Sequence, residues 1–153
     1  MSSGLNWDED YYNPLGQAAE AYYGNDLSNL IKNLTVIETP GKVFKYNSSC
    51  TQLLTFIVEE ATKETISEYA SKKLWQPMGA KHPALWSTDV EGGDEKGFCC
   101  INSNTRDFAR LGKLYMHKGN WNGLQILDSS YVKDATSAAN LLDKKGMPNT
   151  NYG

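Results

Sequence analysis

The amino-acid sequence predicts one mainly α-helical domain, with about five helices and minor strand, and three observations lead to this fold class. The chain has 153 residues, of which 40% are hydrophobic and 22% are charged, as in a single globular domain. Apolar residues recur at spacings of three and four in several segments, as on the buried face of a helix. Polar cap-type residues precede these segments, and glycine or proline follows several of them.

Each predicted helix follows residues whose side chains can accept a hydrogen bond from the first helical turn. The predicted helices are 27–34 after Asp26, the segment that begins at Asn47, Ser48 and Ser49, 66–75 after Thr65, 104–118 after Ser103, and 130–136 after Asp128. Between them we expect loops over 1–24, 80–97 and 146–153, an extended run over 43–46, a buried extended run over 98–101, and a turn with a short strand over 121–127.

Composition argues against several classes of function. The net charge of -3, without clustered basic residues, argues against a nucleic-acid partner. No stretch approaches the roughly 18 apolar residues of a membrane span, and the N-terminus lacks the pattern of a secretory signal. His82 and His117 lack metal-ligand spacing, so no metal or other cofactor is expected. Cys50, Cys99 and Cys100 are an odd set with two neighbours, which is a poor disulfide framework.

One tripeptide, Tyr46-Asn47-Ser48, lies where a short extended run meets a helix. By itself it predicts only a core tyrosine followed by a helix cap. Its position has chemical consequences, because free backbone N–H groups and the positive end of the helix dipole lie at a helix N-terminus. The surrounding sequence, P-G-K-V-F-K-Y-N-S-S-C-T-Q-L-L-T-F-I-V-E-E-A-T-K from Pro40 to Lys63, decides between the two interpretations.

This segment closely resembles the region around the catalytic tyrosine of serine hydrolases of the class C β-lactamase and penicillin-binding protein family. Three further segments resemble the same family in the same order: Met1–Leu5 (M-x-S-G-L), Leu74–Gly79 (P-L-G-M), and Thr105–Gly112 followed by Gly119 and Gly123 (A-x-D-x-A-R-F-G…G). Together the four cover nearly the whole chain, and the branch of 6-aminohexanoate-dimer (nylon oligomer) hydrolases is most alike. The resemblance implies that residues 1–153 are the helical domain of the β-lactamase/penicillin-binding fold.

The resemblance also implies acyl transfer on a small-molecule amide or ester. In the family, a serine of an S-x-x-K motif attacks the carbonyl, and a tyrosine paired with the lysine moves the proton. A free tyrosine loses its proton only near about pH 10 and needs nearby positive charge to act as a base. By resemblance Tyr46 takes this role, and Ser48 lines the cleft and hydrogen-bonds the substrate or the lysine. Because relatives are usually exported, a periplasmic or extracellular location is implied.

Two motifs of the family are missing from their expected places. Residues 1–45 contain no S-x-x-K, and the one at Ser130–Lys133 follows Tyr46, where it resembles a routine solvated helix. Residues 144–146, Lys-Lys-Gly, lack the apolar strand that the family's Lys-Thr-Gly motif needs. We therefore expect a fragment whose α/β domain is missing at both ends, which is inactive alone and whose uncovered, partly apolar face favours self-association.

Three alternatives stay open. The parent protein could be a true β-lactamase or D-alanyl-D-alanine carboxypeptidase, or a catalytically dead homologue that serves as a binding module. An unrelated helical interaction domain would instead bury Tyr46 and bond its hydroxyl internally. The acidic, aromatic loop 7–12 is a hypothesis for substrate contact. Arg106, Asp107 and Arg110 could form a substrate subsite, but a structural role is favoured for them. Trp75, Trp86 and Trp121 could line a pocket, but packing is favoured for them.

Overall fold

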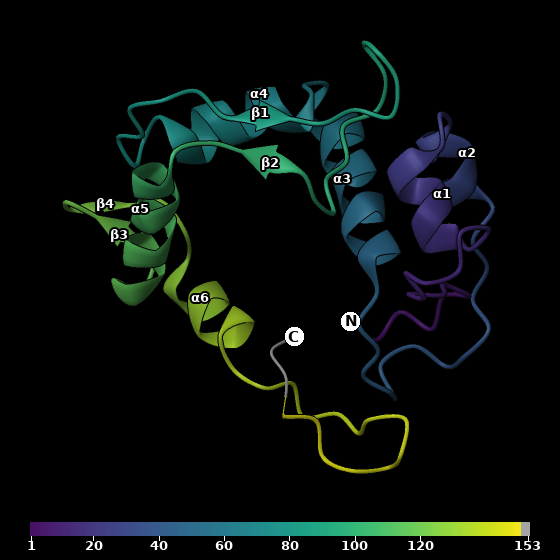
Figure 1. Cartoon of the computed structure of the whole chain (residues 1–153). Coiled ribbons are helices and arrows are strands. Elements are labelled where there is room, and N and C mark those ends of the chain that lie inside the picture. The colour runs from purple at the N-terminus through teal and green to yellow at the C-terminus, as the bar shows by residue number, and fades with distance from the viewer. Residues whose placement is uncertain (151–153) are drawn as a thin grey trace.

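The computed structural model describes residues 1–150 and confirms a mainly helical chain. These residues contain six α-helices, one π-helical turn and four short strands. In chain order they are α1 (Gln17–Tyr23), α2 (Leu27–Lys32), α3 (Ser48–Thr62), α4 (Ile66–Ala70), the π-helical turn η1 (Ser71–Trp75), β1 (Leu85–Trp86), β2 (Ile101–Asn102), α5 (Thr105–Met116), β3 (Asn120–Trp121), β4 (Leu124–Gln125) and α6 (Ser129–Ala135). The helices follow one another round an open arc, from α1, α2 and α3 through α4 to α5 and α6 (Figure 1).

Most of these helices begin at a residue whose side chain caps the first turn. Four predicted caps are confirmed, each accepting a hydrogen bond from a backbone N–H of the first turn: Asp26, Asn47, Thr65 and Asp128. The prediction that Ser103 caps α5 was wrong. Asn104 has the extended backbone of a cap, and its side chain accepts a hydrogen bond from the Arg106 amide at 2.9 Å. The Ser103 hydroxyl instead donates to the Pro83 carbonyl at 2.9 Å.

The expectation of loop over residues 1–24 was wrong for α1. Gly16, the residue before this helix, makes no side-chain cap, so the start of the helix carries no cap signal in the sequence. Packing stabilises α1 instead, because its alanines lie in the buried apolar cluster that joins the N-terminal segment to α2. The members of this core cluster are Trp7, Ala18, Ala21, Leu27, Leu30 and Ile31.

Helix α4 runs directly into η1, where the backbone hydrogen bonds span five residues instead of four. The Gln76 amide donates to the carbonyl of Ser71, five residues back, at 3.0 Å. The prediction of one helix over 66–75 therefore had the right bounds but not this change of pattern. Gly79 follows with a φ of +66°, a left-handed conformation that glycine adopts without steric cost.

Two small antiparallel pairs make up the strands within residues 1–150. β1 pairs with β2, and β3 pairs with β4 in a hairpin close to the turn and strand predicted over 121–127. The prediction of a buried extended run over 98–101 was wrong, because the strand begins only at Ile101, which is exposed. The residues before it form a turn that packs the half-buried Phe98 toward α1.

Cys99 and Cys100 form a disulfide, which corrects the expectation drawn from the cysteine count. That expectation assumed a strand, on which neighbouring side chains point to opposite faces. Cys100 instead has a φ of +70°, in the left-handed region, and the resulting turn allows the two sulfur atoms to meet. Cys50 is a free thiol, and its sulfur donates to the Ser3 hydroxyl at 3.0 Å.

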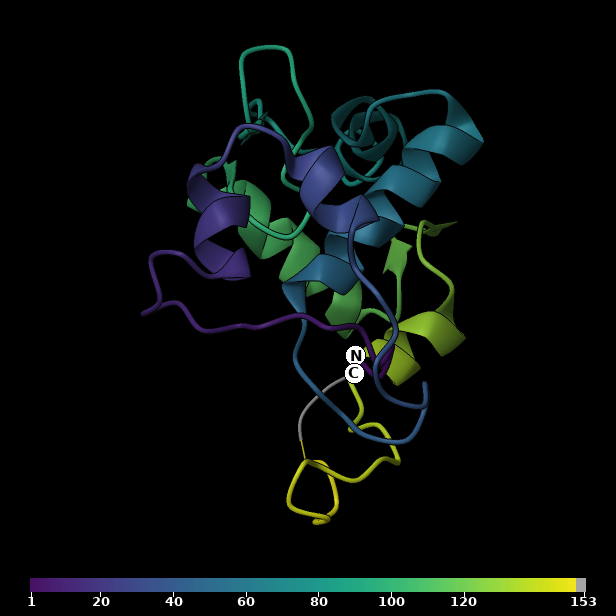
Figure 2. The ribbon, with the colours of Figure 1, turned by 90° about the vertical axis from the view of Figure 1, so that its right-hand side faces the viewer.

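The segment that leads into α3 is held from both ends of the described chain. The Lys45 amide donates to the Met1 carbonyl at 2.8 Å, and the Phe44 amide donates to the Leu142 carbonyl at 2.8 Å. Apart from these contacts, the tail after α6 loops away from the helices, as two views at right angles show (Figures 1 and 2). Of the loop predicted over 146–153, residues 151–153 lie outside the described part of the chain.

Candidate active site

Tyr46 lies two residues before α3, at the end of the helix where free backbone N–H groups gather. Its side chain is 55% exposed, and within residues 1–150 its hydroxyl has no hydrogen-bond partner. Asn47 is buried and fixes the start of α3, because its side-chain oxygen accepts from the Cys50 amide at 3.2 Å. An unrelated interaction domain would bury the Tyr46 side chain and bond its hydroxyl, and this geometry contradicts that alternative.

The ammonium group of Lys45, next to Tyr46 in the sequence, is bound elsewhere. Lys45 Nζ donates to the Trp7 carbonyl at 2.5 Å. Trp7 is itself buried in the core cluster of α1 and α2. Lys45 therefore anchors the N-terminal segment, and its hydrogen bond does not involve the Tyr46 hydroxyl.

Ser48 is joined to the N-terminal loop through Glu9. The Ser48 amide donates to Glu9 Oε2 at 2.9 Å, and the Ser48 hydroxyl donates to Glu9 Oε1 at 2.5 Å. The same carboxylate accepts from the Trp7 indole at 2.6 Å and from the Tyr11 hydroxyl. The Tyr11 and Ser48 hydroxyl oxygens are 3.5 Å apart. These contacts hold loop 7–12 against the start of α3.

The hydrogen bonds also set the protonation of this Glu9 cluster, which consists of Glu9, Trp7, Tyr11 and Ser48. Burial alone would raise the pKa of Glu9, but the hydrogen bonds, led by that from the Ser48 hydroxyl, hold this pKa below its ordinary value. Burial and the hydrogen bond to Glu9 raise the pKa of Tyr11 to about 12. Near neutral pH the cluster therefore holds one carboxylate surrounded by uncharged donors.

Glu9 and Tyr11 carry no sequence signal of their own. The hypothesis for this region rests on the composition of loop 7–12, where three acidic residues lie between a tryptophan and a pair of tyrosines. Glu9 and Ser48 are 39 positions apart, and no rule of local spacing relates residues at such a separation. Only the folded chain shows that the loop lies beside the motif Tyr46-Asn47-Ser48.

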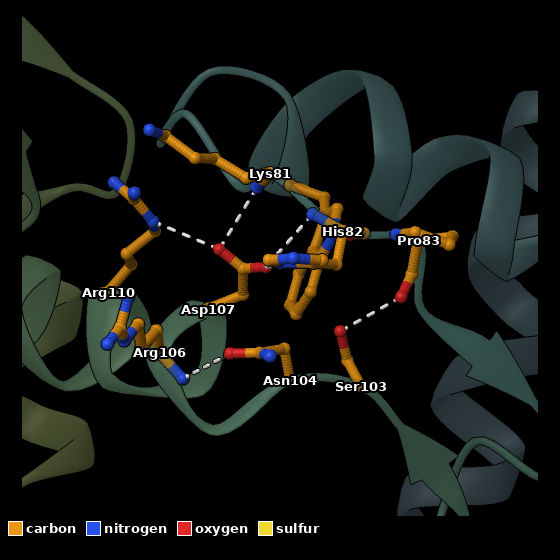
Figure 3. A network of polar contacts seen from close by, with 9 residues as sticks. Lys81, His82, Pro83, Ser103, Asn104, Arg106, Asp107 and Arg110 are labelled. Atoms are coloured by element: carbon orange, nitrogen blue, oxygen red, sulfur yellow. Dashed lines mark hydrogen bonds and ion pairs between the residues drawn. The ribbon is translucent and has the colours of Figure 1, made fainter.

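Asp107 is the centre of a second polar cluster, at the start of α5 (Figure 3). Its side chain is 1% exposed and accepts hydrogen bonds from the backbone amides of Lys81 and His82, each at 3.0 Å. It also accepts from Arg110 Nε at 3.0 Å and contacts His82 Nδ1 at 2.8 Å. These bonds, led by that from the Lys81 amide, lower the pKa of Asp107 to about 2. The carboxylate ties residues 81–82 to α5, which agrees with the favoured structural role.

The three tryptophans considered as pocket residues have different surroundings. Trp75 and Trp86 line a largely apolar pocket of about 180 Å³, and their indole N–H groups donate to backbone carbonyls at 2.9 Å. The Lys113 ammonium lies 5.1 Å from the centroid of the Trp121 ring, a cation–π contact. Trp75 and Trp86 thus combine a packing role with a pocket wall.

The S-x-x-K sequence at Ser130–Lys133 lies in the first turns of a capped helix, α6. Ser130 donates its hydroxyl to the Asp128 carboxylate at 2.5 Å, in the first turn of α6, and Lys133 is exposed. Residues 144–146 lie in the irregular tail, outside any strand. Within residues 1–150 no group of three or more His, Cys, Asp or Glu side chains could hold a metal ion. No helix of this part is long and apolar enough to cross a membrane.

One known protein family matches most of the chain. The family model described as Beta-lactamase matches residues 1–138, which include Tyr46, Ser48 and loop 7–12. The 6-aminohexanoate-dimer hydrolase of Paenarthrobacter ureafaciens is 25% identical over 144 residues. This alignment covers 87% of the present chain and 36% of that protein.

Two solved structures resemble the present one. A candidate 6-aminohexanoate-dimer hydrolase from Bacillus anthracis superposes with a TM-score of 0.72 at 27% identity, over 95% of this chain and 35% of that chain. A candidate beta-lactamase from Bacteroides dorei superposes with a TM-score of 0.59 at 20% identity, over 73% and 34% of the two chains, and supports the fold alone. The chain thus spans about a third of the length of each of these relatives.

Proposed function

We propose, because the chain belongs to the beta-lactamase family, that it supplies the tyrosine-bearing helical part of a serine hydrolase. The hydrolase would cleave an amide or ester through an acyl-enzyme. The observation that carries this proposal is the exposed hydroxyl of Tyr46 at the start of α3, which has no hydrogen-bond partner among the described residues 1–150 and lies beside a loop fixed by the Glu9 cluster. A proton-transfer residue needs such a free hydroxyl within reach of the reacting groups.

In the proposed reaction Tyr46 moves one proton twice. The tyrosinate oxygen takes the proton of the nucleophilic serine as the serine oxygen attacks the substrate carbonyl. It then returns the proton to the leaving amine or alcohol as the carbonyl–heteroatom bond breaks. The serine and lysine of an S-x-x-K motif are absent from residues 1–45 and would come from outside the 153 residues. Since Lys45 is bound to the Trp7 carbonyl, the positive charge beside Tyr46 would come from that outside lysine.

Ser48 has a defined hydrogen-bonding role in this proposal. Its hydroxyl proton is donated to Glu9, so its oxygen retains only acceptor capacity. An acceptor suits the ammonium of the proposed lysine, or an N–H group of an amide substrate. Glu9 thus orients Ser48 through these hydrogen bonds, and loop 7–12 forms a wall beside Tyr46.

The proposed substrate is a small linear amide or a related ester. Two relatives, at 25% and 27% identity, carry the name of 6-aminohexanoate-dimer hydrolases, whose named substrate contains an amide bond between two aliphatic units. The relative described as a beta-lactamase is 20% identical and supports only the fold. A linear amide is therefore favoured here over a β-lactam ring.

Helix α3 supports the expectation of a partner face. The residues that it buries are polar: Ser48, Ser49, Gln52 and Thr55. Its Leu53, Leu54 and Ile57 are 39%, 60% and 53% exposed. Because a helix of a globular protein ordinarily buries its apolar side, this stripe lacks its cover within residues 1–150. We propose that the serine-bearing part of the hydrolase covers the stripe, and that a second copy covers it when the chain is alone.

The test compares the isolated chain with a chimera. In the chimera, this chain replaces the matching 35% of the Bacillus anthracis candidate hydrolase. With 4-nitrophenyl butyrate, we expect no turnover above buffer for the isolated chain. We expect a burst of nitrophenolate and an acyl adduct, detected by mass spectrometry, for the chimera. Steady turnover by the isolated chain, or a folded chimera that forms no acyl adduct, would overturn the proposal.

A further inference from the structure

We propose that the Cys99–Cys100 disulfide is a redox site that a dithiol reductant opens, and that its reduction loosens the segment of residues 86–100. The inference is independent of the proposed hydrolase activity. It rests on the position of the disulfide in the fold, on the backbone of Cys100, and on the contacts that the neighbouring residues make.

The disulfide lies at the end of a densely bonded loop between β1 and β2. The Trp86 indole donates to the carbonyls of Lys96 and Cys99, each at 2.9 Å. The Ser87 amide donates to the Cys100 carbonyl at 3.2 Å, and the Cys99 amide donates to the Lys96 carbonyl at 3.0 Å. Both carbonyls of the disulfide pair are therefore acceptors that hold the two sides of the loop together.

The disulfide keeps Cys100 in an unfavourable backbone conformation. Its φ of +70° is rarely adopted by a residue with a Cβ atom, because that atom crowds a carbonyl oxygen. While the sulfurs are bonded, the small ring restricts the backbone of both residues. Once the bond is broken, Cys100 is free to return to negative φ. That rotation would turn the Cys100 carbonyl away from the Ser87 amide.

The chemistry is a balanced thiol–disulfide exchange. A thiolate of the dithiol attacks one sulfur of the pair, which forms a mixed disulfide and releases the other cysteine as a thiolate that takes up a proton. The second thiol of the reductant, as thiolate, then displaces the first cysteine. The protein gains two electrons and two protons, and the dithiol becomes a disulfide. Cys99 and Cys100 are both half-buried, so a reductant can reach them.

The loosened segment would also lose its contacts with α1. The Phe98 ring packs edge-on against Tyr22, with the centroids 5.4 Å apart, and Lys96 Nζ donates to the Tyr22 carbonyl at 2.6 Å. Tyr22 in turn packs against Tyr11, 6.2 Å between centroids, and Tyr11 donates to Glu9. Ring contacts thus connect the disulfide with the Glu9 cluster of the candidate site.

Hydrogen exchange of the full chain, read by mass spectrometry with and without dithiothreitol, tests the inference. Alkylation first counts the free thiols: we expect one in the oxidised protein, Cys50, and all three cysteines after reduction. The amides of Ser87, Lys96 and Cys99 should exchange about five- to thirtyfold faster after reduction, the factor that corresponds to the cost of a left-handed residue with a side chain. Three free thiols before reduction, or unchanged exchange after it, would overturn the inference.

Two double variants distinguish the effect of losing the disulfide from the effect of the backbone conformation at position 100. Cys99→Ser with Cys100→Ser removes the disulfide and should match the reduced protein. Cys99→Ser with Cys100→Gly also removes it, but glycine adopts positive φ freely, so exchange should stay near that of the oxidised protein. Equal exchange in the two variants would contradict the role of Cys100. Faster exchange confined to residues 86–100, with none around Tyr11, would contradict the connection to the candidate site.

Discussion

Glu9 is the single residue on which the geometry of the candidate site depends most. Its carboxylate accepts from the Ser48 amide and hydroxyl, from the Trp7 indole and from the Tyr11 hydroxyl. Hydrogen bonds to a charged acceptor are stronger than those between neutral groups. Loop 7–12 has few other ties to α3, so we infer that Glu9 positions both Ser48 and the wall beside Tyr46.

Replacing Glu9 with Gln should destabilise the fold by about 1–2 kcal/mol, because an amide group cannot accept from all four donors. The effect should depend on pH. The pKa of Glu9 is lowered in the folded state, so its stabilisation is present above the pKa of an unperturbed glutamate and is lost as pH falls through the lowered value. Urea unfolding of Glu9→Gln between pH 7 and pH 3 should therefore approach the parent curve at the acid end.

The matched control for this prediction is Glu91→Gln, since Glu91 is exposed and lies in a loop. Its unfolding free energy should stay within about 0.5 kcal/mol of the parent value, as for most surface substitutions. If Glu9→Gln and Glu91→Gln unfold alike at pH 7, Glu9 does not hold the loop.

Among the elements, α3 is packed through its polar side against the loop between β1 and β2. Gln52 is fully buried, and its Nε2 donates to the Glu95 carbonyl at 2.9 Å. Thr55 meets Gly97 so closely that a Cβ atom on Gly97 would lie 1.8 Å from Thr55 Oγ1. The loop therefore needs a residue without a side chain at this position, whatever its backbone conformation.

Replacing Gly97 with Ala should destabilise the chain by about 1–3 kcal/mol, the usual cost of overpacking. Adding Thr55→Ala should restore part of the loss, because it removes the oxygen and the methyl group that crowd the site. Gly112→Ala is the control: it lies inside α5 with nothing near its Cβ position, and should stabilise by about 0.5–1 kcal/mol. The melting temperatures of all four proteins are measured by thermal unfolding. Equal melting temperatures for Gly97→Ala and the parent would contradict the close packing of Gly97 against Thr55.

The elements also show how far sequence reasoning extends. Caps such as Asp26 and Asp128 are predictable because a cap bonds to amides two or three positions away. Helix α1 escapes prediction because its stability comes from burial in a tertiary core rather than from a cap at Gly16. The Cys99–Cys100 bond escapes because it depends on one backbone angle that the cysteine spacing does not reveal.

The candidate site divides in the same way. The motif residues Tyr46 and Ser48 follow from a family resemblance in contiguous sequence, and their catalytic roles stay predictions. Glu9 and Tyr11 become visible only when the chain folds loop 7–12 onto α3, because the bond between Glu9 and Ser48 spans 39 positions.

At the scale of the whole molecule, the helices form an open arc rather than layers closed round one core (Figure 1). Neighbours along the chain contact one another, and the main buried cluster lies at one end, between the N-terminal segment, α1 and α2. The exposed apolar stripe of α3, Leu53, Leu54 and Ile57, is then free to meet another surface. The chain spans about a third of the length of its relatives, which supports the proposal that the stripe meets the serine-bearing part of a hydrolase.

The isolated chain should self-associate through this stripe, and sedimentation should show a weight-average mass that rises with concentration. Leu54→Gln together with Ile57→Gln should shift the protein to monomer without loss of helix content. Met116→Gln is the control, because Met116 is 83% exposed on α5 and lies outside the stripe. A parent chain that stays monomeric at all concentrations, or equal association of the double variant, would contradict the proposed face.

The central claim is that Tyr46 transfers the proton in an acyl-transfer reaction. Steady-state kinetics of the chimera with a chromogenic ester tests it most directly, with Tyr23→Phe as the control, because Tyr23 is 89% exposed and lies on α1, outside loop 7–12. Tyr46→Phe removes only the hydroxyl, so the fold should persist while kcat/KM falls by about 10²–10⁴-fold, the usual contribution of general acid–base catalysis. The control should stay within about twofold of the parent, as expected for a surface site. A kcat/KM for Tyr46→Phe equal to that of the control would contradict the claim.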